Sequence, residues 1–380
     1  MKRIFTLMLA LCLVLCACGP EPAVTEPPTE PTTLPVTDPT VPPTEPPTTL
    51  PPTEPPTEPP TEPPTEPPTE PPTEPPVVHR NPLNGTVLEE PFVGRTFAVT
   101  INNVRPALPH RGVSQADVLV EMFANDYCTR GLALFTDVAA VESIGSIRST
   151  RPNFTDLALA YNLVVCHAMG SDVVLKDMYR EGIDNINCDS DIGYRDYTRF
   201  YDQDYDWEHT LFARGTELVA AAERRGFDLA VSDWDYGMLF TEDGTPADGE
   251  AAGEIELIFT LEGHTKTSTL VYDPELGKYV WNQMGREMVD ENSGEKEAFT
   301  NVIILLTSVK TDGHGYHFAQ MYGSGRGYYA CGGRLIPITW EHPYETYPFT
   351  FFLSDGTPLE QGVGNTYLAI APEESPVNYS

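Results

Sequence analysis

The chain has 380 residues, a formal net charge of −33 and 38 prolines that are unevenly spread. Residues 19–78 hold 25 of these prolines and 11 acidic side chains, but no Lys, Arg, Phe, Tyr or Trp. Residues 79–380 carry 21 basic and 45 acidic side chains, a formal charge of −24. Such an acidic surface repels nucleic-acid phosphates, which excludes a general nucleic-acid binder. About 300 residues remain to fold, enough for two domains of ordinary size.

Residues 1–17 have the plan of a bacterial lipoprotein signal peptide. Lys2 and Arg3 precede an apolar run, Ile4–Ala17, that is too short to cross about 30 Å of hydrocarbon. Leucine at −3, a small residue at −1 and then Cys18 match the lipobox, so we expect cleavage before Cys18 and a lipid on its thiol. The expected lipid is a diacylglycerol, whose two acyl chains anchor a protein stably in a membrane. The predicted partner is thus the membrane, on the extracytoplasmic face of the bacterial cell. A plain secreted protein with a chance cysteine is the alternative.

Residues 18–78 are predicted to be a disordered Pro-rich linker. A Thr-Glu-Pro-Pro repeat runs unbroken from Thr53 to Pro76. Proline fixes φ and removes backbone donors, which favours polyproline II over helix or sheet. At about 3.1 Å per residue the linker reaches at most roughly 190 Å. We interpret it as a spacer that holds the folded part away from the membrane; a Pro-rich ligand for a binding domain is the alternative.

Residues 79–240 show alternating strand and helix signals, which predict an N-terminal mixed α/β domain. Short apolar runs predict strands at Phe97–Ile101, Val118–Phe123, Leu132–Val138 and Leu163–Cys166. Helices are predicted at Asn153–Tyr161 after Pro152, at Ser171–Arg180 with Ser171 as cap, and at Leu211–Arg225 with Thr210 as cap.

After a polar, Gly-rich loop at 241–253, the residues 254–372 are predicted to form a mostly β C-terminal domain. The expected strands are Ile255–Thr260, Ser268–Tyr272, Tyr279–Asn282, Val302–Leu306, Gly327–Ala330 and Phe349–Leu353. No helix signal follows Gly323–Gly327, so we predict a glycine-rich turn there rather than a dinucleotide site. The predicted fold class is α+β, with the Pro-rich linker in front.

Four cysteines follow the signal peptide: Cys128, Cys166, Cys188 and Cys331. Their spacing fits no metal-binding pattern, and their disulfide state stays open. Asp202, Asp204 and Asp206 have the spacing of a calcium loop, but Trp207 stands where that loop needs glycine. We therefore expect no metal site and no cofactor.

The strongest signal for a binding site lies where the first predicted helix begins. Arg148 and Arg151 flank Ser149 and Thr150 there. A helix N-terminus and two guanidinium groups together offer the donors that a carboxylate or phosphate requires. The segment therefore predicts an anion-binding site.

Other residues extend this hypothesis. Arg130 and Arg195 are further candidates for the same site, and Asp117 and Glu121 are candidate supporting carboxylates. The alternative is that the arginines only pair with Asp117, Glu121 or Asp156 and hold the domain together.

His167 follows an apolar strand, a position at which many α/β sites lie. Its ring could bind the ligand or transfer a proton near neutral pH, or it could be a core histidine. Asp117 and Glu121 as a glycosidase pair would lie about 13 Å apart along a strand, which is too far. Aromatic residues alternate with aspartates in 194–207, a mixture suited to sugar rings or to a packed loop.

Several motifs in fixed order resemble the YerB-like lipoprotein family across residues 81–371. They are Asn81-Pro82-Leu83-Asn84-Gly85, Ala98–Asn103, Arg105-Pro106, Ser114–Asp117, Glu121, Thr129-Arg130, Ile144–Pro152, His167, Asn301–Ile303 and Gly364–Thr366. The resemblance implies an exported lipoprotein and no particular activity. Glu208 replaces the family's proline before His209, and Met169 replaces a glycine, which weakens a role for His209 and a tight turn beside His167.

The sequence thus predicts a membrane-tethered lipoprotein that binds an anionic or glycan ligand of the cell envelope through its arginines. A hydrolase or transferase that uses His167 with the arginines is one alternative. A protein-interaction scaffold is another. The ligand's identity and the oligomeric state are left open.

Overall fold

The computed structural model describes residues 78–125, 128–199, 206–231, 234–312 and 315–380. The predicted signal peptide, Cys18, the linker up to residue 77, and Asp202 and Asp204 lie outside these residues. The described residues all belong to one compact unit.

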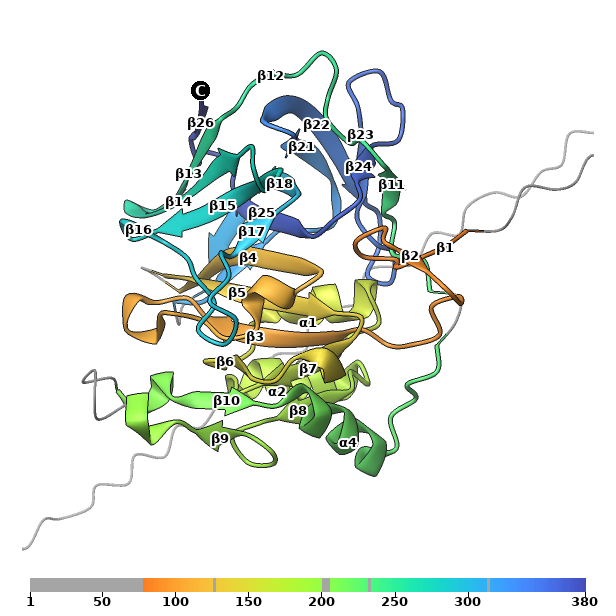
Figure 1. Ribbon diagram of the computed structural model, residues 1–380. Helices are drawn as coiled ribbons and strands as arrows, with labels where there is room; N and C mark the ends of the chain where they lie inside the picture. Colours follow the sequence, from red (N-terminus) through yellow and green to blue (C-terminus); the bar gives the residue numbers. More distant parts are fainter. Residues whose placement is uncertain (1–77, 126–127, 200–205, 232–233, 313–314) are drawn as a thin grey trace, which may run out of the picture. The chain divides into compact units, whose positions relative to one another are not determined.

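The centre of this unit is an 11-stranded sheet (Figure 1). Its order is β12 (Glu250–Ala251), β22 (Arg334–His342), β21 (Gly323–Cys331), β18 (Asn301–Thr307), β25 (Thr366–Pro372), β4 (Val118–Asn125), β5 (Cys128–Phe135), β3 (Phe97–Asn102), β7 (Val164–His167) and β8 (Asn185–Asn187), with β23 (Thr350–Phe352) beside β22. β25 runs parallel to β4, with Thr366 opposite Val118. The sheet therefore continues across the predicted boundary at 241–253, and the division into domains 79–240 and 254–372 stays a prediction.

A second, six-stranded sheet comes from the C-terminal region. Its order is β16 (Arg286–Glu287), β15 (Lys278–Gln283), β14 (His264–Asp273), β13 (Glu254–Leu261) and β26 (Val377–Tyr379), with β17 (Ala298–Phe299) beside β15. In β13 every second residue is buried, including Ile255, Leu257 and Phe259, so one face of this sheet packs inward. The region is mostly β, and the class is α+β.

Shorter elements complete the described chain. They are β1 (His79–Arg80) with β2 (Val87–Leu88), β6 (Ile144–Gly145) with β10 (Leu211–Ala213) and β9 (Tyr194–Arg195), β11 (Leu239–Thr241) with β24 (Glu360–Gly362), β19 (Val309–Thr311) with β20 (His317–Ala319), and the 3-10 helices η1 (Arg105–Ala107), η2 (Val113–Gln115), η3 (Val138–Ala140) and η4 (Trp207–His209).

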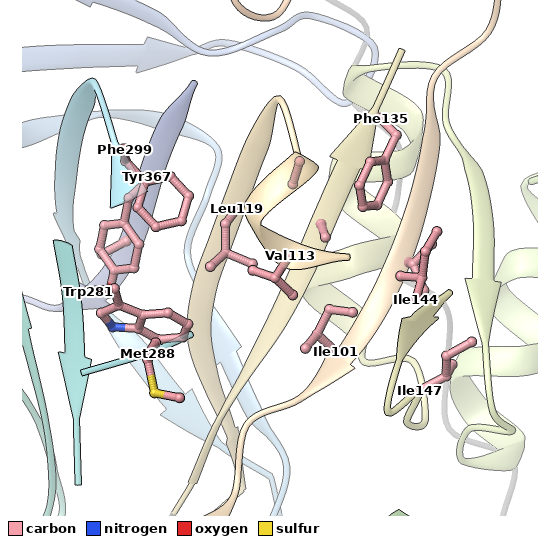
Figure 2. Packing of buried hydrophobic residues seen from close by; sticks show 14 of the residues in the cluster. Ile101, Val113, Leu119, Phe135, Ile144, Ile147, Trp281, Met288, Phe299 and Tyr367 are labelled. Carbon is pink, nitrogen blue, oxygen red and sulfur yellow. The ribbon is translucent and has the colours of Figure 1, made fainter. Parts of the chain in front are cut away.

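The strands at the middle of the main sheet are buried on both faces, which explains their unbroken apolar sequence. In β4, Val118 and Val120 belong to the same apolar cluster as Phe154 of α1 (Pro152–Ala160). On the opposite face, Leu119 belongs to the cluster that contains Trp281 of β15 (Figure 2). The main sheet thus lies between helices and the second sheet.

Two of the three predicted helices are confirmed. α1 begins at Pro152, and α2 (Asp172–Arg180) is capped by Ser171, whose Oγ accepts from the backbone N–H of Val174 at 3.4 Å. The six predicted C-terminal strands also lie within or overlap observed strands. The predicted strand Leu132–Val138 begins earlier and ends at Phe135, where η3 follows.

The predicted helix Leu211–Arg225 with Thr210 as its cap is wrong in its first part. Residues 211–213 form β10, whose Phe212 lies opposite both Gly145 of β6 and Tyr194 of β9. α4 begins only at Gly215 and ends at Arg225. A Cβ at Gly215 would lie 1.7 Å from the carbonyl oxygen of Val138, so this close approach of α4 to η3 requires glycine.

The predicted glycine-rich turn at 323–327 is also wrong. These residues begin β21, which pairs with β22 over its whole length. The indole of Trp340 lies so close to Gly325 that a Cβ would meet it at 2.5 Å. The glycine therefore makes room for a buried aromatic ring within a strand.

Two further findings concern the described residues alone. Among them, no helix has the length and apolar character needed to cross a bilayer. Their four cysteines form no disulfide, and Cys166, Cys188 and Cys331 are buried.

Candidate functional site

The segment 146–151 enters between the diverging ends of β3 and β7. The two strands pair as far as Val99 and Cys166. Beyond that point, the N–H of Arg148 donates to Thr100 O at 3.1 Å, and the N–H of Ala168 donates to Arg148 O at 2.9 Å. α1 begins directly afterwards, with Arg151 as its N-cap residue. Backbone hydrogen bonds thus hold this segment at the start of α1.

Arg130 of β5 is 3% exposed, and its Nη1 donates to Ser149 O at 2.8 Å. Arg151 donates to Ala124 O at 3.2 Å, and its guanidinium lies 5.4 Å from the centre of the Tyr316 ring. Within the described residues, neither Arg130 nor Arg151 forms an ion pair. Both guanidinium groups are held by carbonyl oxygens instead of carboxylates.

Arg148 differs, because its Nη2 donates to Glu208 Oε2 at 2.7 Å. Oε1 of Glu208 lies 3.7 Å from Nε2 of His209. His209 is 4% exposed, its Nδ1 lies 2.8 Å from the side-chain nitrogen of Asn102, and burial lowers its pKa. The partner of Arg148 is therefore the glutamate that departs from the family pattern.

The three arginines are close enough to affect one another. Burial lowers the pKa of Arg130, and the charges of Arg151 and Arg148 lower it further. Burial and Arg148 also lower the pKa of Arg151. In the described part, Arg130 and the segment 146–151 hold four buried polar atoms without a hydrogen-bond partner: Nε of Arg130, Oγ of Ser146, Nε of Arg148 and Oγ1 of Thr150. A buried unpaired donor costs about 1–3 kcal/mol. Arg130, Arg148 and Arg151 form what we call the arginine cluster.

Three neighbours of the arginine cluster escaped the sequence reasoning. In the sequence, Glu208 stands out only as a departure from the family, Tyr316 carries no signal, and Cys128 is a candidate only for a metal site or a disulfide. The thiol of Cys128 donates to Asn125 Oδ1 at 2.8 Å and lies within electrostatic reach of Arg130 and Arg151. Only the pairing of β4 with β5 brings it there.

His167 lies outside the cluster. Its side chain is buried, with Nδ1 2.9 Å from Met169 O and Nε2 3.2 Å from Asn185 Oδ1. Burial lowers its pKa. The hydrolase hypothesis requires the His167 ring to lie beside the arginines. In the structure, both ring nitrogens instead face residues at the end of β7 and on β8.

Arg195 also stands apart from the arginine cluster. It forms an ion pair with Asp189, donates to Trp207 O at 2.7 Å, and stacks on the Trp207 ring at 3.3 Å from its centre. These contacts fasten β9 to η4, the short helix that carries Glu208.

The three acids considered as partners of the arginines contact other groups. Asp117 accepts from Thr136 N at 2.7 Å and from Asn84 at 2.5 Å, and burial raises its pKa. Glu121 pairs with Lys266. Asp156 accepts from the hydroxyl of Tyr322 at 3.0 Å. The described ion pairs therefore do not join the arginines to these acids.

The Asp156 side chain makes the stability of the protein depend on pH, because burial raises the pKa of this carboxyl group to about 6. Its folded-state pKa lies above the ordinary value, so ionisation opposes folding and stability falls as the pH rises from about 4 to about 6. We expect Asp156→Asn, which keeps an acceptor for Tyr322, to stabilise the protein by about 1–3 kcal/mol at pH 8 and by almost nothing at pH 4. Urea unfolding at both pH values measures this. An equal gain at pH 4 would show that the cost of burying the ionised carboxylate is not the cause.

One group of possible metal ligands occurs in the described part. Atoms of Asp206, Glu208 and His209 lie within 4.8 Å of one another. Arg148 already supplies a positive charge to Glu208 in this group.

Two cavities in the described part are lined by other residues. One of about 570 Å³ is bordered by Lys278 and Lys296, and one of about 410 Å³ by Tyr329 and Leu359. The arginine cluster instead reaches solvent through Arg148, whose side chain is 27% exposed.

The fold and the site together define an α+β protein with a partly buried arginine cluster where segment 146–151 meets β5. Comparison with known families identifies the family. Residues 83–228 match "Protein of unknown function (DUF3048) N-terminal domain", and residues 258–368 match the corresponding C-terminal domain. The chain belongs to this family, as the resemblance predicted.

Two comparisons with individual proteins agree. The chain is 25% identical over 296 residues to "Putative lipoprotein YerB" of Bacillus subtilis (strain 168), which covers 77% of this chain and 86% of the relative. The crystal structure of the YerB protein from Bacillus subtilis matches with a TM-score of 0.68 and 22% identity, over 79% of this chain and 99% of that one. The second match shows a shared fold.

Proposed function

We propose that this protein is a lipoprotein of the cell envelope, anchored through Cys18, whose arginine cluster binds an anionic group of an envelope ligand. One observation carries the proposal: Arg130 is almost completely buried beside Arg148 and Arg151, and its described side-chain partner is a carbonyl oxygen. A buried charge is costly unless an opposite charge or several hydrogen bonds offset it. A phosphate or carboxylate group would supply both, since oxyanions accept from several guanidinium donors at once.

The position of the cluster suits this role. It lies beside the start of α1, whose positive end favours anions. Residues 79–380 carry a net charge of −24, and yet three arginines lie together here. The lipobox and the Pro-rich linker support a location at the membrane surface with long reach, and the name of the Bacillus subtilis relative agrees with that location.

The binding test uses purified cell-wall fragments and phosphorylated glycans as probes. The double variant Arg148→Ala/Arg151→Ala is expected to bind at least about tenfold more weakly than the wild type, because each charge-assisted contact contributes about 1.5–3 kcal/mol. The matched control, Arg224→Ala/Arg225→Ala, removes two neighbouring arginines that pair with Asp191. Equal binding by the site variant and the wild type would remove the arginines from the account, and equal loss in both variants would indicate a general charge effect.

A further inference from the structure

We infer that Glu208 holds Arg148 in the place of the ligand's anionic group, and that the ligand which displaces it is a compact dianion of the phosphate-monoester type. This inference rests on the proposed function and names its ligand class. It makes Glu208 a specificity-determining residue, because any anion that enters the cluster must compete with this carboxylate.

The geometry of Glu208 fits an internal competitor. Its carboxylate makes the ion pair with Arg148 at 2.7 Å, while its side chain is 44% exposed. The next residue, His209, is buried and faces Asn102 at 2.8 Å. His209 therefore holds the backbone of η4, whereas the partly exposed Glu208 side chain has solvent beside it into which it can turn.

The charges of the cluster select the ligand. Glu208 neutralises one of three guanidinium groups, and Arg130 and Arg151 keep two positive charges that face carbonyl oxygens. A monoanion such as acetate replaces Glu208 with no gain in charge. A dianion can bond Arg148 and in addition approach Arg130 or Arg151, so only the dianion gains from displacing the glutamate.

Cys128 and Asp206 lie near the cluster but do not change this balance of charges. The thiol of Cys128 donates a hydrogen bond to Asn125 Oδ1 and is not a carboxylate that competes for the arginines. Asp206 lies within 4.8 Å of Glu208, but within the described residues it forms no ion pair with an arginine. Asp206 is therefore a matched control, since it carries the same charge at nearly the same place.

The experiment measures binding of inorganic phosphate, succinate and acetate to the purified protein by calorimetry at pH 8 and constant ionic strength. The wild type is expected to bind phosphate at least about tenfold more tightly than acetate. Glu208→Gln removes the competing charge and is expected to bind phosphate about three- to tenfold more tightly, with acetate binding now measurable. Asp206→Asn is expected to change phosphate binding less than Glu208→Gln does, because within the described residues Asp206 forms no ion pair with Arg148. Succinate as tight as phosphate would replace the phosphate type by a dicarboxylate and overturn that part of the inference.

The outcomes separate this inference from the proposed function. Phosphate binding that depends on Arg151 but is unchanged in Glu208→Gln, or raised equally in Asp206→Asn, overturns the role of Glu208 and leaves the anion site standing. Phosphate binding that is unchanged in the double variant Arg148→Ala/Arg151→Ala contradicts the proposed function itself, whatever Glu208 does.

Discussion

Replacing Lys266 by methionine is expected to lower the free energy of unfolding by about 3–5 kcal/mol, because it leaves the buried carboxylate of Glu121 without its counter-charge. The two side chains are 5% and 0% exposed. Burial alone would raise the pKa of Glu121, but the charge of Lys266 and the hydrogen bonds to this carboxylate more than reverse it. Urea unfolding measures the loss.

The network around this ion pair joins distant parts of the chain. Glu121 lies on β4, Lys266 and Ser268 on β14, and Tyr367 on β25, and each of the latter three bonds to the carboxylate. Adding Glu121→Gln to Lys266→Met is expected to recover part of the lost stability, because the buried charge is then gone. The control Lys296→Met breaks two solvent-accessible ion pairs, with Asp273 and Glu287, and is expected to change stability far less than Lys266→Met. Equal effects of Lys266→Met and Lys296→Met would contradict the importance of burial.

Arg130→Met is expected to have the opposite sign, with stability unchanged or raised by up to about 3 kcal/mol while phosphate binding is lost. The substitution removes a buried charge that burial and two neighbouring arginines disfavour, at the cost of one hydrogen bond to Ser149 O. Thermal unfolding with and without phosphate measures both effects, because a ligand that binds only the folded state raises the melting temperature.

The wild type is expected to melt at a higher temperature in phosphate at constant ionic strength, and Arg130→Met is expected to show no such rise. A variant that is strongly destabilised without phosphate would show that Arg130 is structural. The arginines would then be the internal network that the sequence left as an alternative.

Local signals in the sequence predicted where two of the three helices begin. Pro152 and Ser171 mark the starts of α1 and α2 through their own chemistry, so no distant contact is needed. The sequence of Leu211–Ala213 favours the first turn of a helix. In the structure these residues instead form a strand that pairs with Gly145 of β6 and Arg195 of β9. Tertiary pairing overrides local propensity there. The glycines of β21 similarly depend on Trp340, which only the strand register brings close.

In the candidate site, too, contacts between residues close in sequence could be predicted, whereas contacts between distant strands could not. Arg148 and Arg151 are neighbours in sequence, so their proximity follows from the chain itself. The partners of Glu121 and Asp117 could not be foreseen, because Lys266 lies 145 residues beyond Glu121 and joins it only when the second sheet packs on the first. The sequence groups His167 with the arginines by its position after a predicted strand, and Arg195 by its residue type, but their strands place both elsewhere. The membrane anchor at Cys18 stays a prediction from the sequence.

A crystal structure of the protein grown in inorganic phosphate would show whether the arginine cluster binds an anion in exchange for Glu208. We expect one phosphate ion within hydrogen-bonding distance of Arg148 and of Arg130 or Arg151, with the Glu208 carboxylate turned away into solvent. Glu208 still bonded to Arg148 at saturating phosphate, with phosphate ions only at other surfaces of the molecule, would contradict it.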